Sequence, residues 1–99
     1  MAYNLPCDFE WDEVKSHRCE TERGFGFADI LPAFADPARR IEPDERREYG
    51  EDRFRLLGLV GERLFVIAFT MRGRTVRIIS ARKASARERR FYGEDRGKA

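Results

Sequence analysis

The residues in this sequence best suited to chemistry are arginines that fall on or beside expected strands: Arg53, Arg55, Arg74, Arg77 and Arg82. Arginines on a rigid strand backbone can converge on a phosphate and stabilise the charge that grows there in a transition state. RNA supplies its own nucleophile, the ribose 2′-hydroxyl, so the protein adds only phosphate binding and proton transfer. The alternative without a functional role is that these arginines solvate an open sheet face or form ion pairs with acidic residues such as Glu62.

Other catalytic signatures are missing from the sequence. It has no Gly-x-Ser-x-Gly, no glycine-rich phosphate loop and no His-Glu-x-x-His. One histidine, His17, and two cysteines, Cys7 and Cys19, fit no zinc spacing. The carboxylates are plentiful but scattered, so no magnesium site can be argued. If the chain is an enzyme, we expect it to work without a metal or a cofactor.

Charge divides the chain into two unequal parts. Residues 1–71 carry ten basic and fifteen acidic side chains, whereas residues 72–99 carry ten basic and three acidic ones. The last third is therefore a concentrated cationic surface, which attracts polyanions and nucleic acid above all. A solvated face that meets an acidic protein partner is the alternative.

Length and composition predict one cytosolic domain. A chain of 99 residues, 41% of them hydrophobic, suffices for one core. We expect residues 8–93 to be ordered and the tail after Gly93 to be frayed. The first residues do not resemble a secretory signal peptide, and the sequence has no apolar run long enough to span a membrane. The two cysteines do not suggest a disulfide scaffold, so we expect a cytoplasmic protein with reduced thiols and no membrane contact.

The apolar periodicity predicts two early helices. Phe9 and Trp11 alternate on one face of a strand over 7–11. Asp12 is a good N-cap for a helix over 12–23 that ends at Gly24. An apolar stripe from Phe27 to Phe34 then predicts a second helix, kinked or shortened by Pro32 and ended at 36–37.

The rest of the chain predicts hairpins and a final helix. We expect an edge strand over 38–42, a loop over 43–52, and strands over 52–60, 63–71 and 74–81 with turns at 61–62 and 72–73. Ser85 and Glu88 form a capping box for a helix over 84–92, from which Phe91 docks on the sheet. The fold class is α+β: two N-terminal helices and a C-terminal helix packed on a three- to four-stranded antiparallel sheet.

Two signatures in this sequence resemble those of the BrnT family of ribonuclease toxins. The opening one is Phe9-Glu10-Trp11-Asp12-x-x-Lys15. The closing one is Arg77-Ile78-Ile79-Ser80-Ala81-Arg82-Lys83-Ala84 followed by Arg87-Glu88-x-x-x-Tyr92. Between them, Phe34-x-Asp36-Pro37, Asp52-Arg53-Phe54, Gly58 and a hydrophobic strand ending at Thr70 also fit. The resemblance spans about residues 8–93.

The resemblance implies a RelE-like fold and an endoribonuclease that arrests growth. Because the sequence shows no metal-ligand spacing, we expect this enzyme to be metal-independent. It also implies a partner, a BrnA-type antitoxin, through which alone the pair would contact operator DNA. We expect phosphate binding and catalysis from Arg53, Arg77 and Arg82, with Lys15, Glu88 and Tyr92 as candidates for proton transfer or substrate placement. Further RNA contacts are expected from Arg55, Arg74, Lys83 and Arg87. Antitoxin contacts are expected from Trp11 and Phe91.

The sequence departs from the family pattern between the first helix and the second. Where relatives have Asn and then Lys-His-Gly, this chain has Cys19 and then Glu22-Arg23-Gly24. The histidine is missing and a lysine has become an acid, and His17 is not a positional substitute. A catalytically silent relative that only binds antitoxin or nucleic acid is therefore the main alternative. A stand-alone RNA-binding domain ranks last, because we expect the sheet to lack the aromatic pairs on adjacent strands that RNA-stacking sheets display.

Overall fold

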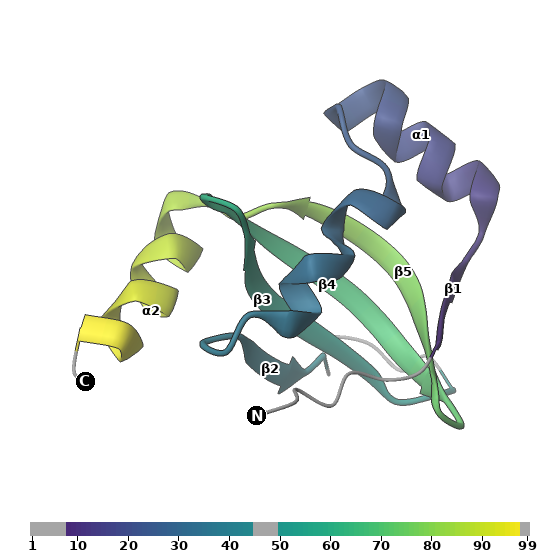
Figure 1. Ribbon diagram of the computed structural model, residues 1–99. Helices are drawn as coiled ribbons and strands as arrows, with labels where there is room; N and C mark the ends of the chain where they lie inside the picture. The colour runs from purple at the N-terminus through teal and green to yellow at the C-terminus, as the bar shows by residue number, and fades with distance from the viewer. Residues whose placement is uncertain (1–7, 45–49, 98–99) are drawn as a thin grey trace.

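The computed structural model describes residues 8–44 and 50–97, with side chains through residue 93. Its elements are β1 (Asp8–Trp11), α1 (Glu13–Arg23), η1 (Phe27–Ala35), β2 (Arg40–Pro43), β3 (Arg53–Val60), β4 (Arg63–Arg72), β5 (Thr75–Lys83) and α2 (Ala86–Gly97). Figure 1 shows a twisted sheet with η1 across one face and α2 at one end. The α+β class is as expected.

The sheet has five strands in the order β1-β5-β4-β3-β2, and it is mixed. β2 to β5 pair antiparallel, as their short connections require, but β1 pairs parallel with β5. Our expectation of three or four strands, all antiparallel, was therefore wrong. The reason is that β1 pairs with β5, the last strand in the sequence. Loop lengths cannot reveal a pairing between segments so far apart in the chain.

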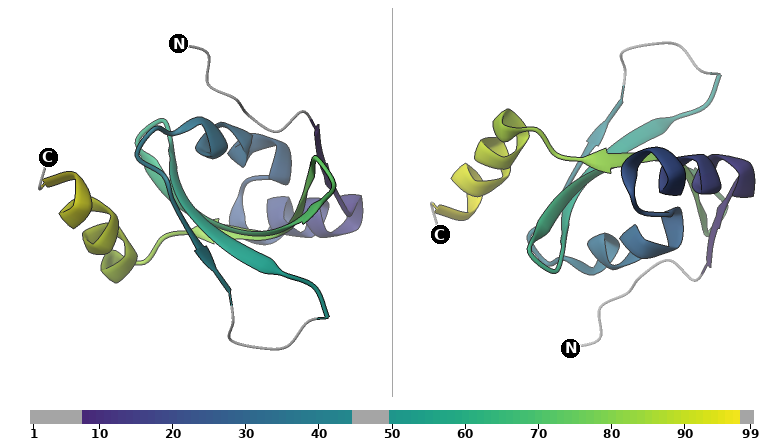
Figure 2. Two further views of the ribbon diagram at one scale, coloured as in Figure 1. Left: turned by 90° about the horizontal axis from the view of Figure 1, so that it is seen from below. Right: turned by 90° about the horizontal axis from the view of Figure 1, so that it is seen from above.

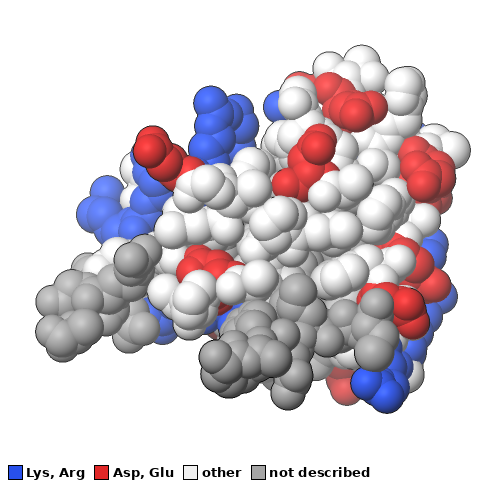
Figure 3. Space-filling view, viewed as in Figure 1, with Lys and Arg blue, Asp and Glu red and all other residues white. Residues whose placement is uncertain are grey.

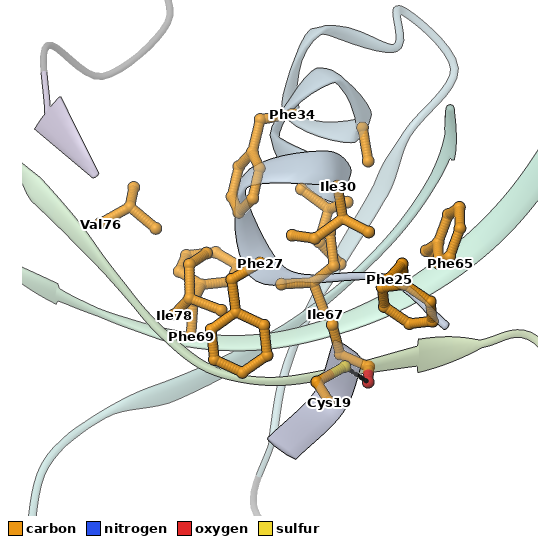
Figure 4. Packing of buried hydrophobic residues seen from close by; sticks show 13 residues of the cluster. Cys19, Phe25, Phe27, Ile30, Phe34, Phe65, Ile67, Phe69, Val76 and Ile78 are labelled. Carbon is orange, nitrogen blue, oxygen red and sulfur yellow. Dashed lines mark hydrogen bonds between the residues drawn. The ribbon is translucent and has the colours of Figure 1, made fainter. Parts of the chain in front are cut away.

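The main core lies between the sheet and η1. Phe27, Ile30 and Ala33 are 2%, 0% and 0% exposed, and they pack on β4 and β5 residues that include Ile67 and Ile78 (Figure 4). η1 is a 3₁₀ helix throughout, rather than the kinked or shortened α-helix that we expected. Three of its four buried residues, Phe27, Ile30 and Ala33, recur every three positions, which suits three residues per turn. In an α-helix the Pro32 ring would also clash with the carbonyl of Ala28, four residues earlier.

Gly58 explains how closely η1 approaches β3. A β-carbon at this position would lie 2.6 Å from the Ala33 carbonyl oxygen and 2.9 Å from Leu56 Cδ2. Such contacts are far shorter than van der Waals distances, so only glycine permits this packing.

Most expected boundaries of the early elements are confirmed. The Asp12 side chain accepts a hydrogen bond of 2.9 Å from the Val14 amide at the start of α1. Gly24 ends α1 in the left-handed region, with φ 88°. β2 begins two residues later than expected and ends one residue later, and the β4–β5 turn lies at 73–74, also one residue later. Cys7 and much of the expected loop lie outside the described residues.

The C-terminal helix differs from the expectation. The Ser85–Glu88 capping box is confirmed, since each side chain bonds the other's amide, at 2.8 and 3.1 Å. However, α2 extends away from the end of the sheet rather than lying on it (Figure 2), and it continues to Gly97. Tyr92, not Phe91, packs against the sheet, with 5% of its surface exposed against 37% for Phe91. The helix phase decides this: Tyr92 meets Leu57, Leu64 and Val66.

Charge is unevenly distributed over the molecule. On the face that η1 covers, uncharged and acidic side chains predominate, and basic ones gather at its edges and around the start of α2 (Figure 3). Among the described residues, no helix is both long enough and apolar enough to cross a membrane.

Candidate functional site

The site is built on the outer face of the sheet, which we define as the face opposite η1. Glu10, Arg77, Thr70 and Arg53 pair in register across β1, β5, β4 and β3. Residues in one register row point to the same face of a sheet. Their neighbours Phe9, Ile78, Phe69 and Phe54 belong to the core on the other side. The row therefore places one guanidinium group on each side of Thr70, that of Arg77 and that of Arg53.

A β-bulge in β5 sets which face its arginines use. Phe69 pairs with Ile78 and Ala68 pairs with Ser80, so Ile79 is an extra residue. Arg82 is the fifth residue after Arg77, and side chains alternate between the two faces along a regular strand. Without the bulge, the two arginines would therefore point to opposite faces. With it, they pair with Thr70 and Val66 and share the outer face. Bulges commonly redirect side chains beside functional sites.

The row opens into a recess of about 170 Å³. Four cationic and two acidic side chains line it: Lys15, Arg53, Arg72, Arg77, Asp12 and Glu51. Thr70 also lines it, and its hydroxyl bonds the Asp52 carbonyl oxygen. Asp12 and Lys15 belong to the start of α1, where unpaired amides add positive potential. The residues therefore converge from three parts of the sequence on a site suited to an anion.

The arginines of the recess lie close to two carboxylates, Glu10 and Glu51. Arg77 Nη1 lies 3.2 Å from Glu10 Oε2, whereas Arg72 lies 4.0 Å from Glu10 and 3.8 Å from Glu51. Arg53 Nε also lies 3.8 Å from Glu51. Only the first of these is short enough for a hydrogen bond. Loose, partly exposed pairs contribute little to stability, so a phosphate can replace them.

A second cluster lies where α2 leaves the sheet. Arg82 binds Glu88 through two hydrogen bonds, each 2.8 Å long. The hydrogen bonds from Arg82 lower the pKa of Glu88 from 4.5 to about 2. Burial opposes this shift, whereas the bond from the Ser85 amide adds to it. Glu88 is therefore a carboxylate throughout the physiological range, and its two oxygens are occupied.

Tyr92 is enclosed in the same region. Its hydroxyl donates a hydrogen bond to Asp36, a buried residue at the end of η1. The same carboxylate accepts bonds from the amides of Ala38, at 2.9 Å, and Leu59, at 2.8 Å. Tyr92 thus links α2 to η1 and β3, and its hydroxyl does not reach the recess.

The structure therefore separates the six expected catalytic residues. Lys15, Arg53 and Arg77 meet in the recess. Arg82, Glu88 and Tyr92 belong to the second cluster, and Arg82 pairs four positions along β4 from Thr70, about 13 Å away. Arg72, Glu10, Thr70 and Glu51 were not singled out from the sequence. Glu10 had a usable signal, since it alternates with the inward-facing Phe9 and Trp11.

The expected RNA-binding and antitoxin-binding residues are spread more widely. Arg55 and Arg87 line a groove beside α2 together with Phe91. Arg74 lies in the β4–β5 turn and Lys83 at the end of β5, both exposed. Trp11 is half-buried, with its ring edge-to-face on Phe27 at 6.4 Å, so it belongs largely to the core. In the described part of the chain, no group of three or more His, Cys, Asp or Glu residues could hold a metal ion.

The comparison with protein families decides the identity. Residues 11–88 match the model of a family described as the ribonuclease toxin BrnT of type II toxin–antitoxin systems. The chain belongs to the BrnT toxin family. No curated protein matches the chain. Membership of this family makes the chain a ribonuclease toxin of a type II toxin–antitoxin system. A toxin of this kind has an antitoxin partner and an RNA substrate.

The part of this BrnT toxin that matches the family includes the cationic residues of the recess and the Arg82–Glu88 pair. Glu10 lies just before the match, and Phe91 and Tyr92 lie just after it. The side chains that depart from the family pattern lie within α1: Glu22 and Arg23 are exposed on its last turn, whereas Cys19 is buried. They line a shallow hollow with Lys15 and Arg18, next to the recess but separate from it.

Proposed function

We propose that this BrnT toxin is a metal-independent endoribonuclease with a RelE-like mode of action, and that the recess binds the scissile phosphate. The observation that carries the proposal is the register row of Arg77, Thr70 and Arg53, with Lys15 and Arg72 at its rim. Fixed guanidinium groups around one small recess are what a phosphate needs.

In the proposed reaction, the ribose 2′-hydroxyl attacks the adjacent phosphorus in line with the departing 5′ oxygen. The bond to the 5′ oxygen breaks, leaving a 2′,3′-cyclic phosphate and a 5′-hydroxyl. Arg53 and Arg77 stabilise the extra negative charge on the phosphorane, for which one fixed donor is worth roughly 10²–10³ in rate. Lys15 delivers the proton to the leaving oxygen. Glu10 accepts the 2′-hydroxyl proton once phosphate has displaced it from Arg77.

We assign a structural role, rather than a catalytic one, to Arg82, Glu88 and Tyr92. Arg82 holds Glu88, Glu88 caps α2, and Tyr92 anchors α2 to Asp36. These residues position the helix and do not contact the reacting phosphate. Arg55, Arg74, Lys83 and Arg87 extend the cationic surface along which RNA lies.

We further propose that the toxin acts in the cytoplasm and arrests growth, and that a BrnA-type antitoxin neutralises it. Operator DNA would be contacted only through the antitoxin. The half-buried Trp11 and the exposed Phe91 remain candidates for the antitoxin contact.

The experiment is expression from a tightly controlled promoter, following growth and the integrity of total RNA. We expect rapid arrest with RNA cleavage, reversed by co-expression of the antitoxin. Arg77→Ala should abolish both effects, whereas Arg90→Ala, which removes an exposed arginine on α2, should not. Normal growth with intact RNA at matched soluble expression would contradict the proposal.

A catalytically silent binding module is the second candidate. The observation that favours it is that Glu10 and Glu51 already contact all three arginines of the recess. If these pairs persist with RNA present, phosphate cannot enter. The wild type would then bind RNA weakly at the recess, and Glu10→Gln, which frees Arg77, should strengthen binding of an uncleavable strand. In an active enzyme Glu10→Gln should instead lower an existing cleavage rate.

A further inference from the structure

A groove of about 390 Å³ lies between α2 and the outer face of the sheet. Its lining residues are Glu42, Arg55, Leu57, Arg87, Glu88 and Phe91. Arg55 is the second residue after Arg53 on β3, so the two point to the same face. The groove and the recess are therefore neighbouring parts of one surface.

The groove contains two arginines and two carboxylates, so its lining is polar as well as apolar. Its two carboxylates are engaged: Glu42 accepts a bond of 2.9 Å from Arg55 Nη2, and Glu88 is held by Arg82. Arg87 lies on the exposed side of α2, and the second cation of the groove, Arg55, is half-buried. The groove thus combines guanidinium groups with the apolar surfaces of Leu57 and Phe91.

Phe91 gives the groove an aromatic wall. Its neighbour Tyr92 anchors the helix, which leaves Phe91 with 37% of its surface exposed. The Arg40 guanidinium carbon lies 3.8 Å from the centroid of the Phe91 ring and supports one face of it. A planar ring held at the edge of a groove that also offers guanidinium groups is a typical platform for a nucleobase.

We propose that this groove binds a nucleobase of single-stranded RNA, stacked on Phe91, while a phosphate of the same strand lies in the recess. The inference rests on the proposed function and deepens it, because it gives the ribonuclease a base-binding subsite. Leu57 lies four residues from Arg53 along β3, about 13 Å away. A short stretch of unpaired strand can bridge that distance.

An antitoxin segment fits the groove less well. Small-molecule sites have volumes of roughly 300–1,000 Å³, so this groove suits one base and its sugar. An amphipathic helix would need a longer apolar groove with anchor sites along several turns. Two arginines and two engaged carboxylates among six lining residues do not provide such anchors.

The test measures binding to two uncleavable probes of equal length: a short single strand with 2′-deoxy sugars, and the same strand with abasic sites. Phe91→Ala should weaken binding of the base-bearing strand about 10-fold, in line with the usual loss of one stacked base. Binding of the abasic strand should not change, and Phe91→Trp should keep the affinity of both. Ile41→Ala is the matched control, since Ile41 is 48% exposed and lies on the opposite face.

Equal affinity of wild type and Phe91→Ala for the base-bearing strand would overturn the inference. So would an equal loss for both strands, because it would indicate a disturbed helix rather than a lost base contact. Weaker antitoxin binding with unchanged strand binding would assign the groove to the protein partner instead. Because neither probe can be cleaved, a failure of the ribonuclease proposal is seen separately, as intact RNA despite base-dependent binding.

Discussion

Arg77 and Arg82 extend from the same face of β5 although an odd number of positions separates them, because Ile79 bulges out of the ladder between them. This one extra residue allows the recess and the base of α2 to lie on a single surface. It also keeps Val76 and Ala81 in the core on the other side. The bulge therefore aligns the two halves of the family's closing motif.

The bulge predicts that β5 tolerates a deletion better than an insertion. Deleting Ile79 leaves Ile78 and Ser80 adjacent, opposite Phe69 and Ala68, so every other residue keeps its face. Adding an alanine between Ser80 and Ala81 would send either Arg82 or its core neighbours to the wrong face. Thermal unfolding followed by circular dichroism should show a cooperative transition for the deletion and none for the insertion. The reverse order would show that the bulge does not set the register.

Glu88 predicts a stability that depends on acid. Its folded pKa is depressed from 4.5 to about 2, so its contribution is present above pH 4.5 and is lost as the pH falls towards 2. Glu88→Gln should lower the free energy of unfolding by about 1–2 kcal/mol at pH 7, after allowance for the partial exposure of Arg82. Urea titrations should show this difference shrinking between pH 4.5 and pH 2. Glu62→Gln, in the exposed β3–β4 turn, is the control, and a difference that is constant with pH would contradict the assignment.

Tyr92 should matter for stability and not for the chemical step. Tyr92→Phe keeps the buried ring and removes its bond to Asp36, which should cost about 1–3 kcal/mol because a buried acceptor loses a partner. Cleavage per folded molecule should stay at the wild-type rate. A large drop in rate with unchanged stability would instead give the hydroxyl a direct catalytic role.

Gly58 should resist substitution. Gly58→Ala places a methyl group against the Ala33 carbonyl and should cost about 1–3 kcal/mol by overpacking. Gly93→Ala is a suitable control, because a β-carbon there meets nothing within 4 Å and replaces a helical glycine. It should be neutral or stabilise by about 0.5–1 kcal/mol. Chemical denaturation of both variants measures the contrast, and equal stabilities would contradict this account of the η1–β3 contact.

Local signals predicted much of the fold. The Asp12 cap, the Gly24 end, the Ser85–Glu88 box and the three hairpin strands depend on neighbouring residues, and the structure shows each of them. The pairing of β1 with β5 and the docking of Tyr92 on Asp36 depend on distant residues, which periodicity does not reveal.

The site divides in the same way. Strand arginines were identifiable by their type as candidate phosphate ligands, and three of the expected site residues, Lys15, Arg53 and Arg77, do meet in the recess. Which of them meet depends on the bulge at Ile79 and on the register of four strands. Arg72 was read as a turn residue because the expected turn was one position too early. It lies instead in β4, beside Glu10 and Glu51.

The most direct test of the central claim is the rate at which purified Arg77→Ala cleaves labelled single-stranded RNA in the presence of a metal chelator. We expect the wild type and the Arg90→Ala control to cleave at equal rates and to leave a 2′,3′-cyclic phosphate. Arg77→Ala should be slower by about 100-fold or more while still unfolding cooperatively. Cleavage by Arg77→Ala at the wild-type rate, or loss of wild-type activity in the chelator, would contradict the claim that this recess is a metal-independent phosphate site.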